Sequence, residues 1–164
     1  MRILGIDPGL IRTGYGLIDA ENIDNIKFVE AGIIRTSSKD AISERVNEIY
    51  KNITDIITEF KPSVLVLEKL YSHCKHPVTS ILMGHARGAV CLACGENGLE
   101  LVNYPSTRVK KALTGNGRAG KHQISDMVKS ILRLKTKPKH FDISDALAMA
   151  ISYVYIEGVR DQNR

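Results

Sequence analysis

Residues 1–35, MRILGIDPGLIRTGYGLIDAENIDNIKFVEAGIIR, decide the fold of this chain. They contain three apolar segments, at 3–7, 14–18 and 27–35, with turn-forming residues between them. This spacing predicts three consecutive strands joined by hairpins. Strands joined by hairpins are antiparallel neighbours, so the chain is expected to begin by building a sheet.

Beyond these strands the hydrophobic pattern changes to alternating helices and strands. Apolar residues, mostly isoleucines, recur every three or four residues across 42–60, which indicates an amphipathic helix that Pro62 ends. The later expected elements are a buried strand at 64–67, a helix at 78–97 closed by Gly98, a strand at 100–103, a short helix at 106–113 capped by Ser106, a glycine-rich loop at 115–120, a helix around 124–132 and a last helix at 142–155. Together they predict an α/β fold in which helices flank a mixed five-stranded sheet, within a single domain covering 1–164.

The composition is that of an ordinary globular protein. Its 164 residues suffice for one hydrophobic core, and 43% are hydrophobic and 25% charged. No apolar run is expected to span a bilayer and the first residues lack the layout of a signal peptide, so we expect a cytoplasmic protein with no membrane partner. Three cysteines argue against a disulfide framework, and the spacing of His73, Cys74 and His76 does not match a structural zinc site.

Basic residues are concentrated in one stretch of a chain whose formal net charge is +5. From 108 to 139 Asp126 is the only acid, and the bases are Arg108, Lys110, Lys111, Arg118, Lys121, Lys129, Arg133, Lys135, Lys137 and Lys139. Such a stretch is typical of a surface that contacts nucleic-acid phosphates. A solvated helix face explains Lys129, Arg133 and Lys135 equally well.

Four acidic residues lie at positions where a charged side chain is expected to need a partner. Asp7 and Glu68 each end an apolar run, and Asp142 and Asp145 lie three residues apart on one face of the expected last helix. Carboxylates brought together at one sheet edge repel each other unless divalent cations neutralise them, and oxygen ligands favour Mg²⁺ or Mn²⁺. Two such ions about 4 Å apart activate water and stabilise the leaving oxygen in phosphodiester cleavage.

Each acid also has a purely structural interpretation. Asp142 would cap a helix, with Asp145 as its capping-box partner, and Asp7 would begin a turn in the sequence DPG. Glu68 is harder to explain in this way, because the exit of a buried strand rarely carries an acid without a function. The four acids taken together favour the metal site over the separate structural interpretations.

Several motifs, in order along the chain, resemble those of RuvC-type Holliday junction resolvases. They are ILGIDPG at 3–9, TGYG at 13–16, LEKLY at 67–71, GHARG at 84–88, RVK at 108–110, GK at 120–121 and DISDALA at 142–148. The resemblance covers nearly the whole chain and implies a ribonuclease-H-like fold. It also implies a homodimer that uses Mg²⁺, with two ions per active site, to nick two strands of a four-way DNA junction symmetrically in recombination and repair. The partners that it implies are junction DNA and the branch-migration proteins RuvA and RuvB.

The resemblance also suggests roles for individual residues. It implies that Asp7, Glu68, Asp142 and Asp145 bind metal, that Lys110 and Lys121 lie near the scissile phosphate, with Lys121 acting in catalysis, and that Tyr71 contacts bases at the junction. We also expect Arg108 and Arg118 to bind DNA. For Tyr71, packing at the edge of the core is an equally good explanation. His85 departs from the family pattern, which has glutamine within this helical motif.

Three other functions were considered. The sequence from Gly115 to Lys121 fits the phosphate-binding loop GxxxxGK, but His122 replaces the Ser or Thr that would hold Mg²⁺, and a helix is expected before the loop. A kinase-like ATPase would need a second domain and a second phosphate loop. A DNA-binding module without nuclease activity would gain nothing from carboxylates beside phosphates.

The expected interface of the homodimer is the helix at 78–97, whose glycines and alanines allow another helix to approach closely. The alternative is that this face packs inside one subunit.

Overall fold

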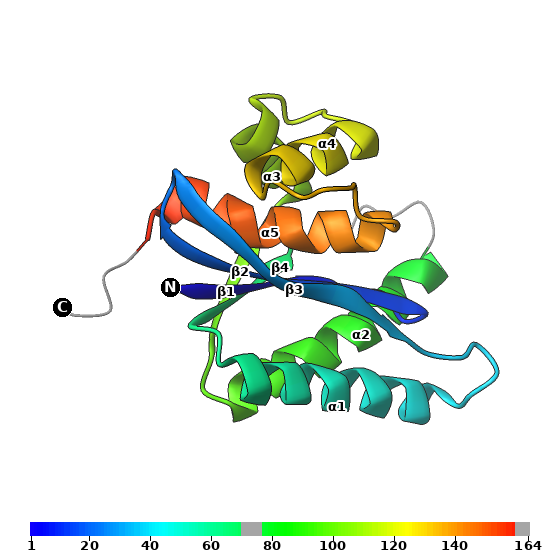
Figure 1. The fold of residues 1–164 in the computed structure, drawn as a ribbon. Coiled ribbons are helices and arrows are strands. Elements are labelled where there is room, and N and C mark those ends of the chain that lie inside the picture. Colours follow the sequence, from blue (N-terminus) through cyan, green and yellow to red (C-terminus); the bar gives the residue numbers. More distant parts are fainter. Residues whose placement is uncertain (70–76, 160–164) are drawn as a thin grey trace.

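The computed structural model describes residues 1–69 and 77–159, and its centre is a mixed sheet (Figure 1). The strands are β1 (Arg2–Asp7), β2 (Arg12–Asn22), β3 (Asn25–Arg35), β4 (Val64–Glu68) and β5 (Glu100–Tyr104), in the order β3-β2-β1-β4-β5. β1, β2 and β3 pair as antiparallel neighbours, whereas β4 is parallel to both β1 and β5. The predicted hairpins, the buried strand predicted at 64–67 and the predicted mixed sheet are therefore confirmed.

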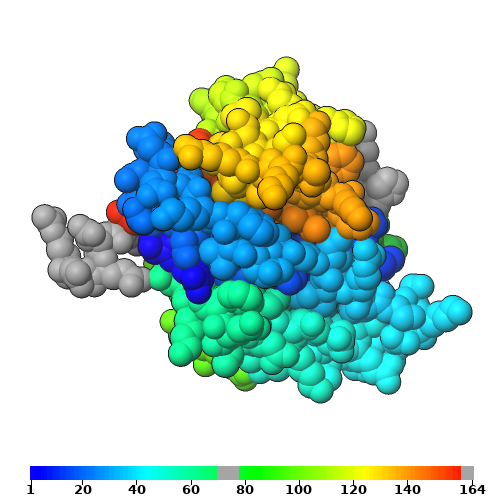
Figure 2. All heavy atoms as spheres, in the orientation of Figure 1, coloured from blue at the N-terminus to red at the C-terminus, as the bar shows by residue number. Residues whose placement is uncertain are grey.

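Helices cover both faces of this sheet. They are α1 (Ile42–Phe60), α2 (Pro77–Glu96), α3 (Ser106–Thr114), α4 (Lys121–Ile131) and α5 (Phe141–Glu157). In Figure 1, α1 and α2 lie against one face, while α5 lies against the other with α3 and α4 outside it. Figure 2 shows the same layers as solid surfaces, with the blue β2–β3 hairpin between the yellow and orange segments and the cyan and green ones. Each face has its own cluster of buried apolar side chains, as an amphipathic helix on each side of a buried sheet requires.

Glycines allow α5 to lie directly on the strands. A Cβ atom at Gly5 of β1 would come within 2.0 Å of the carbonyl oxygen of Ala146, and one at Gly14 of β2 within 2.1 Å of that of Asp142. Only glycine leaves room for a helix backbone at this distance. The two strands therefore fix the position of α5, and with it the position of its acidic first turns.

The alanines and the glycines of α2 lie on different sides of the helix. Ala86, Ala89 and Ala93 are buried against the core, which fits packing inside one subunit. Around Gly84 and Gly88, in contrast, an added Cβ would meet nothing within 4 Å. The glycine side of α2 is an open apolar face on which Val78, Ile81 and Leu92 are 70%, 61% and 54% exposed.

The apolar character of α2 bears on the expectation that no apolar run spans a bilayer. Within residues 1–69 and 77–159, α2 is the one helix long and apolar enough, by length and composition, to cross a membrane. Its apolar side chains lie both on the side packed against the core and on the open face, so the helix has few charges along its length. Helices of soluble proteins that pack on two sides share this composition.

Candidate active site

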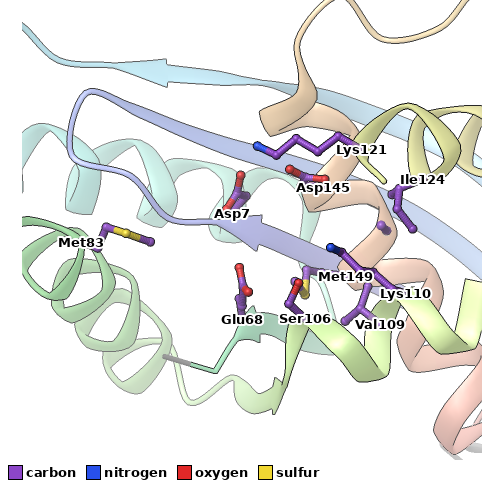
Figure 3. A pocket seen from close by; sticks show the side chains of 11 residues that line it. Asp7, Glu68, Met83, Ser106, Val109, Lys110, Lys121, Ile124, Asp145 and Met149 are labelled. Carbon is purple, nitrogen blue, oxygen red and sulfur yellow. The ribbon is translucent and has the colours of Figure 1, made fainter. Parts of the chain in front are cut away.

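A cavity of about 300 Å³ opens where β1 and β4 end (Figure 3). Its lining includes three carboxylates, two lysines and a serine, which come from strands and helices far apart in sequence. The polar lining residues are Asp7, Glu68, Asp145, Lys110, Lys121 and Ser106, and the apolar ones are Met83, Val109, Ile124, Ala148 and Met149. Polar groups gathered over an apolar floor at the carboxyl ends of strands are typical of an active site.

Asp7 and Glu68 are the final residues of two neighbouring parallel strands, β1 and β4. Burial raises the pKa of Asp7 to about 7, and Asp145, Glu68 and Asp142 add to this rise through charge repulsion. The pKa of Glu68 is also raised, first by burial and then by Asp145. These strand ends therefore hold negative charges close together away from water, which is unfavourable without a cation.

Asp145 and Asp142 enter the site from α5 but occupy different positions. Asp145 lines the cavity, and its pKa is raised by burial, although Lys121 partly offsets the rise. Asp142 is not among the cavity-lining residues; it lies in the first turn of α5, 3.5 Å from the guanidinium of Arg12. Its charge nevertheless raises the pKa of both Asp7 and Asp145. The structure thus brings three of the four predicted acids around one cavity and places the fourth beside it.

The capping interpretation of these two aspartates is not supported. The residue that caps α5 is His140, and no side chain bonds to the first turn as a cap. Asp142 and Asp145 are therefore inside the helix, with their carboxylates used elsewhere.

Lys110 and Lys121 enter the cavity from two further helices. Lys110 is on α3, and Lys121 is the first residue of α4, directly after the glycine-containing loop. Both ammonium groups lower the pKa of Glu68 and Asp145 through charge attraction. In Figure 3 the two lysines flank Asp145. Because α3 and not a strand precedes the loop, the phosphate-binding-loop interpretation is also excluded here.

Two contacts at the site were not predicted from sequence. Ser106 was expected to cap α3, but Pro105 holds the cap position and the serine hydroxyl bonds to the carboxylate of Glu68. Arg87 of α2 donates hydrogen bonds to the backbone carbonyl of Glu68 and to Oδ1 of Asn103. Arg87 belongs to the GHARG motif, but nothing local in the sequence indicates its distant partners.

Arg108 and Arg118, which were also predicted to bind DNA, do not line the cavity. Arg108 is exposed and its guanidinium lies 5.2 Å from the centre of the Tyr104 ring. Arg118 is exposed in the loop before α4, where its backbone N–H donates to Asn116. Tyr71 falls outside the described residues. The basic stretch is thus divided, with two lysines at the cavity and the other side chains on surrounding surface.

The donor set suits a hard divalent cation. Within the described residues no three His, Cys, Asp or Glu side chains stand close enough to hold one ion by themselves. Mg²⁺, however, typically takes only one or two protein carboxylates and completes its shell with water and substrate phosphate. Three partly buried carboxylates whose pKa values are raised fit such an ion, because its charge would relieve their repulsion.

Comparison with known proteins gives a consistent result. The family model described as crossover junction endodeoxyribonuclease RuvC matches residues 3–153. The protein of that name from Rhodopirellula baltica is 43% identical over 154 residues, which are 94% of this chain and 86% of the relative. The one from Caldicellulosiruptor saccharolyticus is 42% identical over 154 residues, 94% of this chain and 92% of the relative.

Solved structures agree with the sequence relatives. RuvC of T. thermophilus in complex with a Holliday junction substrate matches with a TM-score of 0.91 and 29% identity, covering 96% of this chain and 95% of that one. The yeast mitochondrial Holliday junction resolvase Ydc2 matches with a TM-score of 0.67 and 11% identity, covering 93% and 77%, which is a likeness of fold alone. The predicted ribonuclease-H-like fold is therefore confirmed.

Proposed function

The chain belongs to the RuvC family of crossover junction endodeoxyribonucleases and is a Holliday junction resolvase, and we propose that its catalytic centre is the cavity between Asp7, Glu68 and Asp145. The observation that carries this proposal is the convergence of these acids, with Lys110 and Lys121, at the ends of β1 and β4. A site that combines raised carboxylate pKa values with lysines suits phosphodiester hydrolysis, which builds negative charge on the phosphate.

Asp7, Glu68 and Asp145 would hold Mg²⁺, or Mn²⁺ in its place, with Asp142 contributing from the first turn of α5. When bound, two such ions supply an activated water and stabilise the leaving oxygen. Lys121 places its ammonium beside Asp145 at the mouth of the site, where it would stabilise charge on the scissile phosphate. Lys110 would hold the neighbouring backbone phosphate, and Ser106 keeps the Glu68 carboxylate oriented.

The two symmetric cuts in a four-way junction need two active sites related by a two-fold axis, which a homodimer supplies. The open face of α2 supports this assembly, because Gly84 and Gly88 let a second helix approach and Ile81 and Leu92 would be buried by it. The expected measurement is a dimer at micromolar concentration in sedimentation equilibrium. A protein that stays monomeric with and without junction DNA would contradict the dimer.

Around the site, Arg108, Arg118 and Tyr71 would contact the arms and the crossover of the junction. The exposure of the two arginines on the α3–α4 side supports this role. We further propose that the whole chain acts as one nuclease domain in the cytoplasm and cooperates with RuvA and RuvB during recombination and repair. The membership of the chain in the RuvC family supports these assignments.

A nicking assay on a synthetic four-way junction tests the proposal directly. With Mg²⁺ we expect paired nicks in opposing strands, and with EDTA we expect junction binding without cleavage. A linear duplex of the same sequence is the control and should stay intact. Cleavage that persists in EDTA, or that is equal on the duplex, would contradict the proposed function.

A further inference from the structure

Arg87 connects α2 to the two strand ends beside the active site. Its guanidinium donates to the carbonyl oxygen of Glu68, the last residue of β4, and to the side chain of Asn103 near the end of β5. In the register of the parallel pair, Leu67 lies opposite Asn103 and Glu68 opposite Tyr104. One side chain of the helix therefore binds the final positions of two adjacent strands.

The contact of Arg87 with Glu68 is made through the backbone carbonyl and does not occupy the carboxylate. That carboxylate faces the cavity and accepts a hydrogen bond from Ser106. The guanidinium thus fixes where β4 ends without competing for the oxygens that a cation would need. A planar group with several donors can hold two acceptors at once, which a lysine ammonium on a flexible stem does less well.

The position of Arg87 within α2 gives the contact a second consequence. The side chains of Val78, Ile81 and Leu82, in the first turns of the helix, are exposed, and Ala86 is the first that is fully buried. Met83, one turn before Arg87, lines the catalytic cavity. Arg87 therefore joins the part of α2 nearest the active site to the ends of β4 and β5 by hydrogen bonds, and the open face of the helix is the surface proposed for dimerisation.

We propose that Arg87 is a positioning residue that couples helix α2 to Glu68, so that association of two chains through α2 strengthens cation binding at the active site. The inference rests on the proposed function, because it assigns Glu68 to the cation and α2 to the dimer. Its physical basis is that a partner helix would steady the exposed turns of α2, and Arg87 passes this constraint to the end of β4. Residues that orient ligands in this way typically change metal affinity about 10–100-fold when they are removed.

Mn²⁺ binding to the DNA-free protein, measured from the free-ion EPR signal, tests the first half of the inference. Arg87→Gln should weaken Mn²⁺ binding about 10-fold or more while junction affinity in EDTA and the melting temperature stay near those of wild type. Arg87→Lys should lie between the two, and Asn103→Ala should show a smaller loss in the same direction. High Mn²⁺ should restore the cleavage rate of Arg87→Gln, since its catalytic groups are intact.

The inference is overturned if Arg87→Gln binds Mn²⁺ within about two-fold of wild type. Should Arg87→Gln fail to fold, Asn103→Ala and Arg87→Lys decide in its place, and wild-type affinity in both overturns the inference. Glu68→Gln is the reference variant. Unchanged Mn²⁺ binding by Glu68→Gln contradicts the proposed function, whereas loss in Glu68→Gln with none in the Arg87 variants contradicts only the role of Arg87.

A double-mutant comparison tests the second half. Leu92→Glu places a charge on the open face of α2, away from the cavity, and should block association of two chains. It should weaken Mn²⁺ binding several-fold when Arg87 is present and have little further effect in Arg87→Gln, because the coupling contact is already lost. Equal effects of Leu92→Glu in the two backgrounds overturn the coupling.

Discussion

Helices α5 and α2 both line the proposed catalytic cavity, but they are held in different ways. Ten of the 17 residues of α5 are buried, and Gly5 and Gly14 let its backbone lie directly on β1 and β2. α2 buries its alanines yet leaves Val78, Ile81 and Leu92 exposed beside open glycines. The contacts of α5 are made within one chain, whereas α2 leaves an apolar face uncovered, on which the proposed second chain would pack. α5 therefore fixes its acids beside the cavity within one chain, whereas α2 would link the proposed active site to the assembly of two chains.

The largest expected effect comes from the carboxylates at the strand ends. Asp7→Asn or Glu68→Gln should abolish cleavage, because a neutral amide no longer balances the charge of a divalent cation. Junction binding should be kept and can even tighten, since a negative charge near the phosphates is removed. Nicking and binding assays on one four-way junction measure both quantities. Nicking within a few-fold of wild type by either variant would contradict the proposed site.

A matched pair of glycine substitutions tests the contrast between the two helices. Gly5→Ala places a Cβ 2.0 Å from a carbonyl oxygen of α5, so the helix must move, and we expect a loss of about 3 kcal/mol or more in the free energy of unfolding. Gly88→Ala meets no atom within 4 Å and should stabilise the isolated chain by about 0.5–1 kcal/mol. Urea denaturation of both variants gives the comparison. Similar destabilisation by the two would mean that the face of α2 is not open.

The fold was largely predictable because its signals are local. The isoleucine pattern of α1 and the three apolar strands appear in short stretches of sequence, and the structure confirms their bounds to within a few residues. Asp7 and Glu68 could be assigned to the site because each ends a buried strand. The difference between Asp142 and Asp145 could not be predicted, since both lie on one helix face and the angle of α5 is set by contacts with distant glycines.

The contacts of Ser106 and Arg87 with Glu68 could not be predicted for a similar reason, because they join residues far apart in the sequence. Ser106 has the residue type of a helix cap, but the adjacent Pro105 takes that position and leaves the hydroxyl to Glu68. Arg87 bonds to a backbone carbonyl 19 residues away, and a carbonyl carries no signal in a sequence. Side chains that act through long-range backbone contacts are therefore recognised only once the strands are placed side by side.

The stability of the metal-free protein should depend on pH in a direction that identifies the active-site acids. The pKa of Asp7 is about 7 in the folded chain against 3.8 for a free side chain, so between these values the folded state binds more protons than the unfolded state. Its contribution to stability is therefore present at low pH and is lost as the pH rises through about 7, with an upper limit on the order of a few kcal/mol. Glu68 and Asp145 act in the same direction.

Thermal melts in EDTA at pH 5.5 and 8 should show this loss, and Asp7→Asn should reduce it. Mg²⁺ should raise the melting temperature more at pH 8, where the carboxylates are charged and free to bind it. Asp19 is an internal control, because Arg2 lowers its pKa and its contribution is lost only as the pH falls below about 4. An equal change in melting temperature from pH 5.5 to 8 in EDTA for the wild type and for Asp7→Asn would exclude the buried acid as the cause.

The smallest expected effect distinguishes the role of Lys121 from that of Tyr71. Lys121 lies on the α5 side of the cavity, and Tyr71 precedes α2 in the chain. Lys121 lies beside Asp145 and should act on the scissile phosphate, so Lys121→Ala should slow the cleavage of every junction. Tyr71 is expected to stack on a base at the crossover, a contact worth about 1–3 kcal/mol. A junction whose central bases are already unpaired should therefore partly restore cleavage by Tyr71→Ala and leave Lys121→Ala impaired. Cleavage rates of the two variants on paired and unpaired junctions measure the difference, and an equal response would show that Tyr71 does not stack on the opened crossover.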